Sequence, residues 1–265
     1  MIVTRFAPSP TGLLHLGHAF AAITAAESGD DFLLRIEDLD RGRSRDDHIE
    51  TIYRDLKWLG LSWDEPVLRQ SRRAPAYRGA LETLVRLGLT YRCACTRKEI
   101  AAEIARAGEA QHGPDGPVYP GICRHRDVAA DQPHVLRLDA ARAAALAGPL
   151  TFSEHGKLLP VDPLRFGDIV LARKDLPAAY HLAVVVDDAF QKVTLVTRGE
   201  DLLPATHVQR LLQALLGLPE PAYAHHRLVL DENGKKFSKR DNAVTLAALR
   251  EAGATPSDIR ARLEL

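Results

Sequence analysis

The feature that most constrains the fold is a strand, a tight turn and a helix that follow one another at the start of the chain. Residues 2–6 are predicted to form a short strand, and residues 7–12 contain two prolines and a glycine, which exclude a helix there. The alanine-rich stretch 16–26 then predicts a helix that ends at Ser28 and Gly29. A strand that leads through a turn into a helix is typical of sheets whose parallel strands are joined by crossover helices.

The same alternation of strands and helices continues on both sides of the middle of the chain. Helices are predicted where apolar residues recur every three or four positions, and strands where short apolar runs occur. Before the middle these elements are a strand at 32–36 and helices at 46–59 and 74–87. After it they are a strand at 168–173, an apolar run at 182–186, a strand at 193–196, a helix at 206–216, a strand at 228–230, and short helices at 243–251 and 256–264. The pattern predicts an α/β fold with a parallel sheet.

The middle of the chain breaks this alternation and is expected to be an insertion. It contains all three cysteines, and residues 113–121 are rich in glycine and proline. The expected order is a first half of the α/β domain, the insertion, a second half and a closing segment, with bounds at 1–92, 93–165, 166–217 and 218–265. A length of 265 residues agrees with about two domains.

Composition narrows the class of protein. The chain carries 35 Lys and Arg residues against 35 Asp and Glu residues, with 46% hydrophobic residues, which excludes disordered, collagen-like and coiled-coil chains. No apolar run approaches the ~18 residues that cross a membrane, and no secretion signal is found at the start. We therefore expect a cytoplasmic protein without a membrane partner, whose cysteines are free, catalytic or bound to a metal.

Two segments at opposite ends of the chain point to a nucleotide. His15, Gly17 and His18 stand where the first turn meets the first helix, and lysines dominate residues 235–240. The N-terminus of a helix binds phosphate, glycine lets a nucleotide approach the backbone, and imidazoles donate hydrogen bonds to phosphate oxygens. A lysine-rich loop neutralises the charge that grows on a leaving pyrophosphate. Each segment alone is equally typical of an ordinary helix start or a solvated loop, but together they predict attack on the α-phosphate of ATP.

Six segments resemble the class I aminoacyl-tRNA synthetases, and in particular their glutamyl and glutaminyl branch. The segments are RFAPS at 5–9, PSPTGLLHLGH at 8–18, RIEDLD at 35–40, YHLAVVVDD at 180–188, RGED at 198–201 and KFSKR at 236–240. Phe237 and Arg240 depart from the commonest form of the last segment but leave its lysines in place. The resemblance implies a Rossmann-type class I synthetase catalytic core, with an inserted zinc-containing subdomain similar to an acceptor-binding domain and a short C-terminal helical segment.

The resemblance also implies which residues bind the substrates. The expected glutamate ligands are Arg5, Phe6, Ala7, Pro8, Ser9, Glu37, Tyr180 and Arg198. The expected ATP ligands are His15, Gly17, His18 and Lys239, and the residues expected to bind the transition state are His15, His18, Lys236 and Lys239, with Mg²⁺ accompanying ATP. Two arginines favour glutamate over glutamine, because a neutral amide would leave their charge unpaired. Asp38 and Asp40 are as typical of an acidic loop as of a site.

The three cysteines are candidate zinc ligands. Cys93, Cys95 and Cys123 fall within one short insertion, and three thiolates with a fourth ligand make a closed structural zinc site. By the resemblance the fourth ligand is Tyr119, although chemistry alone favours an imidazole, which His112 or His125 could supply. The alternative is three unrelated small buried cysteines.

The segment after the lysine loop narrows the resemblance further. Only 25 residues follow Arg240, so the anticodon-binding region of full-length glutamyl enzymes is expected to be absent. The chain resembles the glutamyl-Q tRNA(Asp) synthetase family, which activates L-glutamate with ATP without tRNA and then esterifies the queuosine at the first anticodon position of tRNA(Asp). The expected partners are ATP, L-glutamate and that tRNA, and a monomer is expected. The alternatives are a truncated glutamyl-tRNA synthetase that charges a tRNA 3′ end, a small-molecule nucleotidyltransferase, and a non-catalytic RNA-binding module.

A tRNA surface is expected to be locally basic although the net charge is zero. The candidate residues are Arg72, Arg73, Arg124, His125, Arg126, Arg260 and Arg262, and for each of them an ordinary solvated charge is an equal explanation. Val184 is apolar at a position where full-length glutamyl enzymes often carry a polar residue, so the pocket is not expected to copy theirs.

Overall fold

The structure, a computed structural model of the 265-residue chain, describes residues 1–108, 111–230 and 244–265. The chain divides into two compact units, each assembled from separate stretches of sequence. Unit 1 comprises Met1–Arg72, Val193–Leu202 and Pro221–Leu265, and unit 2 comprises Arg73–Lys192 and Leu203–Glu220. These units are defined by how compactly the chain packs, and their boundaries differ from those expected at residues 92, 165 and 217. The expected division into four segments therefore stays a prediction.

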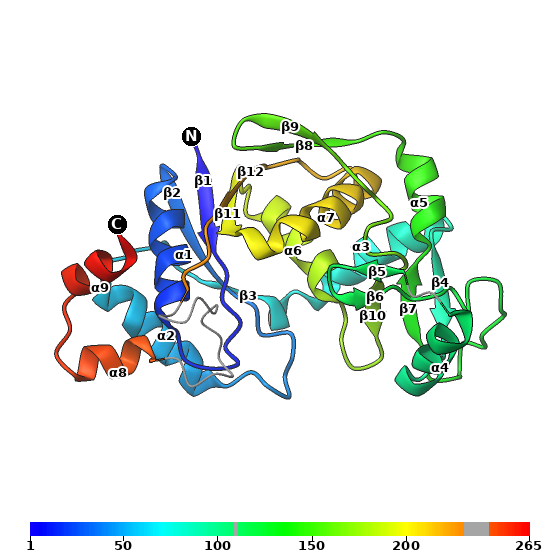
Figure 1. The fold of residues 1–265 in the computed structure, drawn as a ribbon, viewed down its shortest axis with the longest axis horizontal. Coiled ribbons are helices and arrows are strands. Elements are labelled where there is room, and N and C mark those ends of the chain that lie inside the picture. The colour runs from blue at the N-terminus through cyan, green and yellow to red at the C-terminus, as the bar shows by residue number, and fades with distance from the viewer. Residues whose placement is uncertain (109–110, 231–243) are drawn as a thin grey trace. The chain divides into compact units, whose positions relative to one another are not determined.

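Parallel strands form the centre of unit 1, as the sequence predicted (Figure 1). β1 (Val3–Phe6) pairs with β2 (Asp31–Ile36), which pairs with the short β3 (Leu68–Arg69), and all three run parallel. β11 (Leu195–Gly199) pairs in parallel with β12 (Ala222–His226). The backbone N–H of Thr194 donates to the carbonyl of Val3 at 3.0 Å, so the start of β11 lies beside β1. Every residue of β1 is buried, which is typical of a central strand in a parallel sheet.

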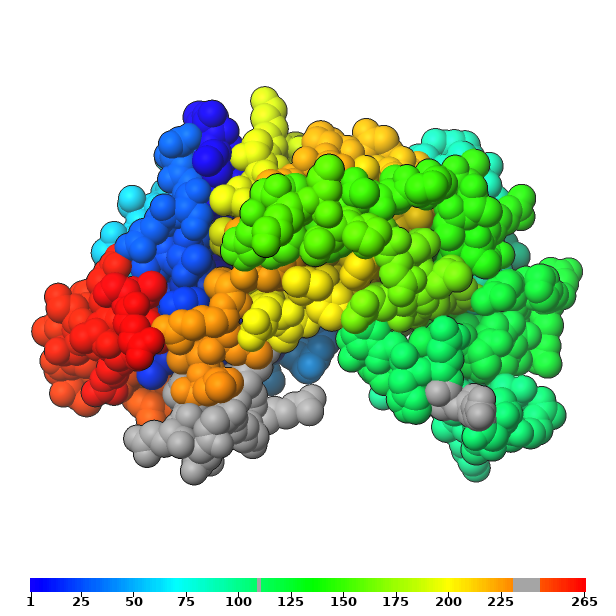
Figure 2. All heavy atoms as spheres, turned by 45° about the horizontal axis from the view of Figure 1, so that its top comes forward, coloured from blue at the N-terminus to red at the C-terminus, as the bar shows by residue number. Residues whose placement is uncertain are grey.

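Four helices and two single 3₁₀ turns complete the described part of unit 1. They are α1 (Leu16–Glu27), α2 (Asp46–Trp58), η1 (Gln70–Arg72), η2 (Glu200–Leu202), α8 (Leu246–Glu251) and α9 (Pro256–Leu263). The buried face of α2, with Ile52 and Leu56, has the spacing that predicted the helix. Leu246 of α8 and Ile259 of α9 join the same core, so the two C-terminal helices pack on the N-terminal elements (Figure 2).

Unit 2 combines helices with small antiparallel sheets (Figure 1). Its helices are α3 (Ala74–Arg86), α4 (Arg97–Ala107), α5 (Ala140–Ala147), α6 (Tyr180–Phe190) and α7 (Leu203–Leu216). Its strands are β4 (Thr90–Cys93), β5 (His112–Gly113), β6 (Gly116–Pro117), β7 (Val135–Leu138), β8 (Thr151–Glu154), β9 (Lys157–Pro160) and β10 (Val170–Arg173). A buried carboxylate, Asp187, joins α6 to α3 by accepting hydrogen bonds from Tyr77 at 2.6 Å and Arg73 at 3.1 Å.

Two sequence predictions about strands were wrong. The strand at 168–173 does not resume a parallel sheet, because β10 pairs antiparallel with β7 in the sheet ordered β10-β7-β4. The strand expected at 228–230 lies instead at Ala222–His226, where pairing with β11 outweighs the stronger strand preference of the Leu-Val-Leu run. The apolar run 182–186 lies inside helix α6, and a short buried apolar run cannot by itself distinguish a strand from a helix.

Within the described residues, no helix combines the length and the apolar character that crossing a membrane requires.

Candidate functional site

The turn after β1 is fixed at the carboxyl edge of the parallel strands in unit 1. Because β1 and β2 run parallel, the segments that follow them meet at one edge of the sheet. The N–H of Glu37 donates to the carbonyl of Pro8, and the N–H of Arg45 donates to that of Pro10, both at 3.1 Å. The prolines supply rigid carbonyl acceptors, so the turn that leads into α1 is held by the chain that follows β2.

His15 and His18 form a close pair at the N-terminus of α1. Their ring centroids lie 3.8 Å apart, and the backbone N–H of His15 donates to Nδ1 of His18 at 3.2 Å. Since Nδ1 of His18 accepts a hydrogen bond, the proton of the neutral ring is on Nε2, which can donate to a phosphate oxygen. The structure therefore brings together the two imidazoles that the sequence singled out, at the end of a helix where anions bind.

Gly17 has a packing role in this pair. A Cβ atom at this position would lie 3.2 Å from ring atoms of His15, which is tighter than most real contacts. The absence of a side chain therefore lets the His15 ring fold back over the first turn of α1. The sequence had suggested that this glycine serves the approach of a nucleotide, and that role stays a prediction.

Arg5 and Arg198, here called the arginine pair, lie on the neighbouring strands β1 and β11. Their exposed fractions are 5% and 6%, respectively. Nη1 of Arg5 donates to the carbonyl of Thr197 at 3.3 Å, and Nε of Arg198 donates to Nε2 of His225 at 3.0 Å. Two positive groups thus lie within the fold of unit 1, and each donates a hydrogen bond to an acceptor on an adjacent strand.

His225 contacts the arginine pair, and sequence reasoning missed it. It lies on β12, in register with Arg198 on β11, and is 7% exposed. The sequence carries no local signal for this contact, because only the parallel pairing of β11 with β12 brings the two residues side by side.

The acidic residues after β2 divide into a candidate ligand and two structural groups. Oε1 of Glu37 lies 3.5 Å from Nη2 of the buried Arg35, and its side chain is 10% exposed. Asp38 accepts hydrogen bonds from Ser71 at 2.7 Å and from Arg69 at 3.0 Å, which joins this loop to β3 and η1. A hydrogen bond from Arg43 lowers the pKa of Asp40. The contacts of Asp38 and Asp40 therefore agree with the interpretation of these residues as part of an acidic loop.

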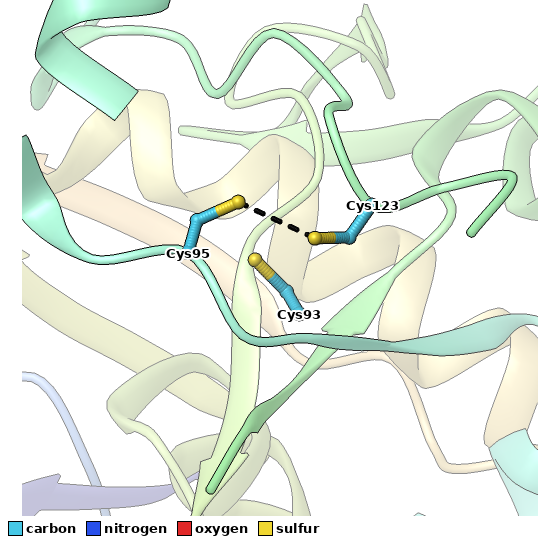
Figure 3. Close-up of side chains that lie close together, drawn as sticks. All are labelled: Cys93, Cys95 and Cys123. Carbon is cyan, nitrogen blue, oxygen red and sulfur yellow. Dashed lines mark hydrogen bonds between the residues drawn. The ribbon is translucent and has the colours of Figure 1, made fainter. Parts of the chain in front are cut away.

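The second candidate site is the cysteine cluster of unit 2, defined as Cys93, Cys95 and Cys123 with Tyr119. The three sulfur atoms all lie within 4.8 Å of one another, and Sγ of Cys95 lies 3.3 Å from Sγ of Cys123 (Figure 3). Oη of Tyr119 lies 3.2 Å from Sγ of Cys93 and 3.6 Å from Sγ of Cys95. The backbone N–H of Cys123 donates to the same oxygen at 2.9 Å.

These four atoms fit the ligand set of a zinc ion. Zinc ligands at about 2.0–2.3 Å from the metal are separated from one another by about 3.3–3.8 Å in a tetrahedron. The separations of 3.2, 3.6 and 3.3 Å given above are near that range, and all of the ligand atoms are sulfur or oxygen. Among the described His, Cys, Asp and Glu residues, the three cysteines are the only group close enough to share an ion, so neither His112 nor His125 joins them. The cluster is therefore compatible with zinc binding.

The surroundings of the cluster affect its protonation. Burial would raise the pKa of Cys93, but hydrogen bonds with Tyr119 and Arg137 outweigh burial and lower it. Burial raises the pKa of the Cys95 thiol to about 11 and, together with the hydrogen bond from Cys93, raises the pKa of Tyr119. The guanidinium of Arg137 lies 3.8 Å from the centre of the Tyr119 ring, a cation that would stabilise a phenolate.

Several predicted residues stay untested. Lys236 and Lys239 lie outside the described residues. Tyr180 begins helix α6 of unit 2 and is 37% exposed, and Val184 of the same helix is buried.

The basic residues expected at a tRNA surface are partly engaged in ion pairs. Arg73 pairs with Asp187, Arg124 pairs with Asp168, and Arg260 pairs with Glu27. The remaining candidates are exposed, namely Arg72, His125, Arg126 and Arg262.

The whole chain, residues 1–265, matches the family described as tRNA synthetases class I (E and Q), catalytic domain. It is 50% identical to the glutamyl-Q tRNA(Asp) synthetase of Rhodobacter capsulatus, over 98% of both chains. It is 46% identical to the glutamyl-Q tRNA(Asp) synthetase of Nocardia farcinica, over 98% of this chain and 82% of the relative. Its fold is similar to that of a glutamate tRNA ligase from Elizabethkingia meningosepticum solved in complex with its amino acid, with a TM-score of 0.78 and 30% identity over 96% of this chain and 58% of that one.

Proposed function

The chain belongs to the class I tRNA synthetases of the glutamate and glutamine branch, and from this premise we propose that it activates L-glutamate with ATP and transfers it to the queuosine of tRNA(Asp). The first step needs no tRNA. The identity of 50% to a glutamyl-Q tRNA(Asp) synthetase over 98% of both chains supports this acceptor.

The observation that carries the proposal is the arginine pair near the carboxyl ends of the parallel strands. Two arginines that are only 5% and 6% exposed suit an anionic ligand, because a guanidinium binds a carboxylate bidentately with charge assistance and a neutral amide without it. Arg5 and Arg198 are the proposed ligands of glutamate, and Glu37, at the same edge, is the proposed ligand of its ammonium group. Tyr180 and residues 6–9 remain proposed ligands on the basis of the resemblance.

The proposed first step forms glutamyl-adenylate. An oxygen of the glutamate α-carboxylate attacks the α-phosphorus of ATP, the bond from that phosphorus to the bridging oxygen breaks, and pyrophosphate leaves. His18, through Nε2–H, and the N-terminus of α1 would bind phosphate oxygens, with Gly17 and His15 beside them. Mg²⁺ would accompany ATP because of the charge of its phosphates.

Lys236 and Lys239 are proposed to bind the departing pyrophosphate. Their structure is not described, but connectivity supports the proposal. The N–H of Leu246 donates to the carbonyl of Leu14 at 2.8 Å, and Thr245 forms a bridge with His15. Lys239 precedes Thr245 by only six positions in the sequence, and Thr245 lies beside the start of α1.

The proposed second step transfers glutamate to the tRNA. A hydroxyl of the cyclopentene-diol of queuosine attacks the acyl carbon, the bond to the phosphate oxygen breaks, and AMP leaves. No residue of the chain needs to form a covalent intermediate in either step.

Cys93, Cys95, Tyr119 and Cys123 would hold one zinc ion. Its proposed role is structural, since four protein ligands leave no open position for substrate. A bound metal would join the end of β4 and the start of α4 to the segment that carries Tyr119 and Cys123, and such a link supplies folding energy.

One alternative keeps the first step and changes the acceptor. The likeness to a solved glutamate tRNA ligase favours an enzyme that charges the 3′ end of tRNA(Glu). A small-molecule nucleotidyltransferase would not need the arginine pair. ATP–pyrophosphate exchange that glutamate does not stimulate would therefore support the nucleotidyltransferase alternative.

ATP–pyrophosphate exchange without tRNA tests the proposed activation. We expect exchange that depends on glutamate and that falls at least about 100-fold with glutamine, because a site built for a charged group rejects the neutral analogue strongly. Exchange that glutamate does not stimulate, or that occurs only with tRNA present, would contradict the proposal. The acceptor is then identified by charging tRNA(Glu) and tRNA(Asp) in parallel.

A further inference from the structure

The Arg198 guanidinium forms a hydrogen bond with a neighbouring side chain, which constrains its direction. Nε of Arg198 lies 3.0 Å from Nε2 of His225, and both side chains are buried. The two residues are register partners in the parallel pair β11–β12, so they leave the sheet side by side.

We propose that His225 is a positioning residue for glutamate, which holds Arg198 so that its terminal nitrogens receive the substrate carboxylate. This inference rests on the proposed function. A guanidinium has no acceptor atom and stays protonated, so Nε–H of Arg198 donates and Nε2 of His225 accepts. The neutral His225 ring therefore carries its proton on Nδ1.

The contact matters because of the shape of the guanidinium group. It can present either the edge with Nε and one terminal nitrogen or the edge with both terminal nitrogens to a carboxylate. The bond to His225 occupies Nε, so bidentate binding uses the two terminal nitrogens. A guanidinium that is oriented before the substrate arrives also loses less side-chain freedom on binding.

A second aromatic residue fixes the ring of His225. The rings of Tyr223 and His225 are parallel to within 3°, with centroids 6.0 Å apart. Tyr223 is 2% exposed, and the guanidinium carbon of Arg198 lies 5.6 Å from its ring centre. Arg198, His225 and Tyr223 therefore form one buried group across β11 and β12.

Arg5, the other member of the arginine pair, is held differently, so the role of His225 can be tested by mutation. Arg5 is held through the carbonyl of Thr197, and no substitution of the Thr197 side chain removes that carbonyl. The bond from Arg198 to His225 ends on a side chain, so replacing His225 removes that bond and leaves the backbone anchor of Arg5 in place.

The test compares His225→Phe with His225→Gln in glutamate-dependent ATP–pyrophosphate exchange, with thermal unfolding as the measure of folding. Phe keeps a flat ring without an acceptor, whereas Oε1 of Gln can lie near the place of Nε2. We expect His225→Phe to raise KM for glutamate at least about tenfold, the effect of one hydrogen bond to a charged group, with KM for ATP and kcat changed less than about threefold. His225→Gln should return KM for glutamate to within about threefold of the wild-type value.

The outcomes separate this inference from the proposed function. A wild-type chain without glutamate-dependent exchange would overturn the proposed function, and the inference with it. An active wild type together with an unchanged KM in His225→Phe, or with equal losses in Phe and Gln, would overturn only the role of His225. If His225→Phe does not fold, His225→Asn replaces it, because the shorter amide cannot reach Nε of Arg198 and should behave as Phe is expected to.

Discussion

The arginine pair of unit 1 and the cysteine cluster of unit 2 are assembled in opposite ways. Arg5 and the residue it bonds to, Thr197, are 192 positions apart and meet because the parallel strands bring them together. Cys95 and Cys123 are 28 positions apart, with α4 and the short strands β5 and β6 between them. The first site is held by the hydrogen bonds of a buried sheet, whereas the thiols of the second contact one another and the Tyr119 hydroxyl and are proposed to share one ion.

The difference predicts how each site responds to change. A site held by strands keeps its geometry when its ligand is removed, so mutations there should alter substrate binding more than folding. A site whose ligands bind one metal ion couples metal binding to folding. Mutations there should therefore alter the stability of the protein more than the rate of its reaction.

Removal of Arg198 is expected to have the largest effect. Arg198→Ala removes two charge-assisted hydrogen bonds of about 1.5–3 kcal/mol each, so kcat/KM for glutamate in pyrophosphate exchange should fall about 1,000-fold. The melting temperature should change little by comparison. Arg198→Lys, which keeps the charge without the fork, should recover only part of the loss. A variant with nearly normal kcat/KM would remove Arg198 from the site.

Removal of Lys239 should reduce the rate of exchange by about 100-fold, the usual result of losing one preorganised charge from a transition state. The matched control is Lys174→Ala, since Lys174 is exposed in unit 2 and has no proposed role. Equal rates for the two variants in pyrophosphate exchange would refute the pyrophosphate role of Lys239.

The cysteine cluster should show the opposite pattern. Wild-type protein should contain about one zinc per chain by metal analysis, and Cys95→Ser should lose it, with a melting temperature lower by roughly 4–10 °C. Tyr119→Phe should also lose zinc, whereas His125→Gln should retain it. Metal-free wild-type protein that is equally stable and active would contradict the zinc site, and zinc loss in His125→Gln alone would move the fourth ligand to histidine.

The smallest effect concerns the pH dependence of stability in unit 2. Burial, with the nearby Arg165, lowers the pKa of His207, whose Nδ1 accepts the N–H of Asp162 at 2.9 Å. Below about pH 6.5 the unfolded chain binds more protons at this residue than the folded chain, so stability is lost as pH falls through that value toward the folded pKa. His207→Asn keeps an acceptor and cannot titrate, so its melting temperature should fall less than that of wild type between pH 7.5 and 5. A His125→Gln control should follow the wild-type curve, and a His207→Asn curve parallel to wild type would refute the assignment.

The local features of both sites could be predicted from sequence, but their long-range contacts could not. The start of α1 with His15 and His18 depends on a turn and a helix that neighbouring residues determine. The grouping of the cysteines with Tyr119 was expected from the resemblance. His225 was missed because its role depends on the register of β12 with β11, and β12 itself was expected six residues later, where the apolar run is stronger.

The antiparallel pairing of β10 was unpredictable for a related reason. An apolar strand of four residues fits a parallel or an antiparallel neighbour equally well, and its partner β7 lies more than 30 residues earlier in the chain. The sequence specifies which segments are buried more clearly than it specifies which segments pair.

The most direct test of the central claim is the transfer of labelled glutamate to purified tRNA. The chain is incubated with ATP and labelled glutamate, and with tRNA(Asp) carrying queuosine, tRNA(Asp) carrying unmodified guanosine at the same position, or tRNA(Glu). We expect label on the queuosine-containing tRNA(Asp) and none on the other two. Label on tRNA(Glu), with none on the modified tRNA(Asp), would contradict the proposed acceptor.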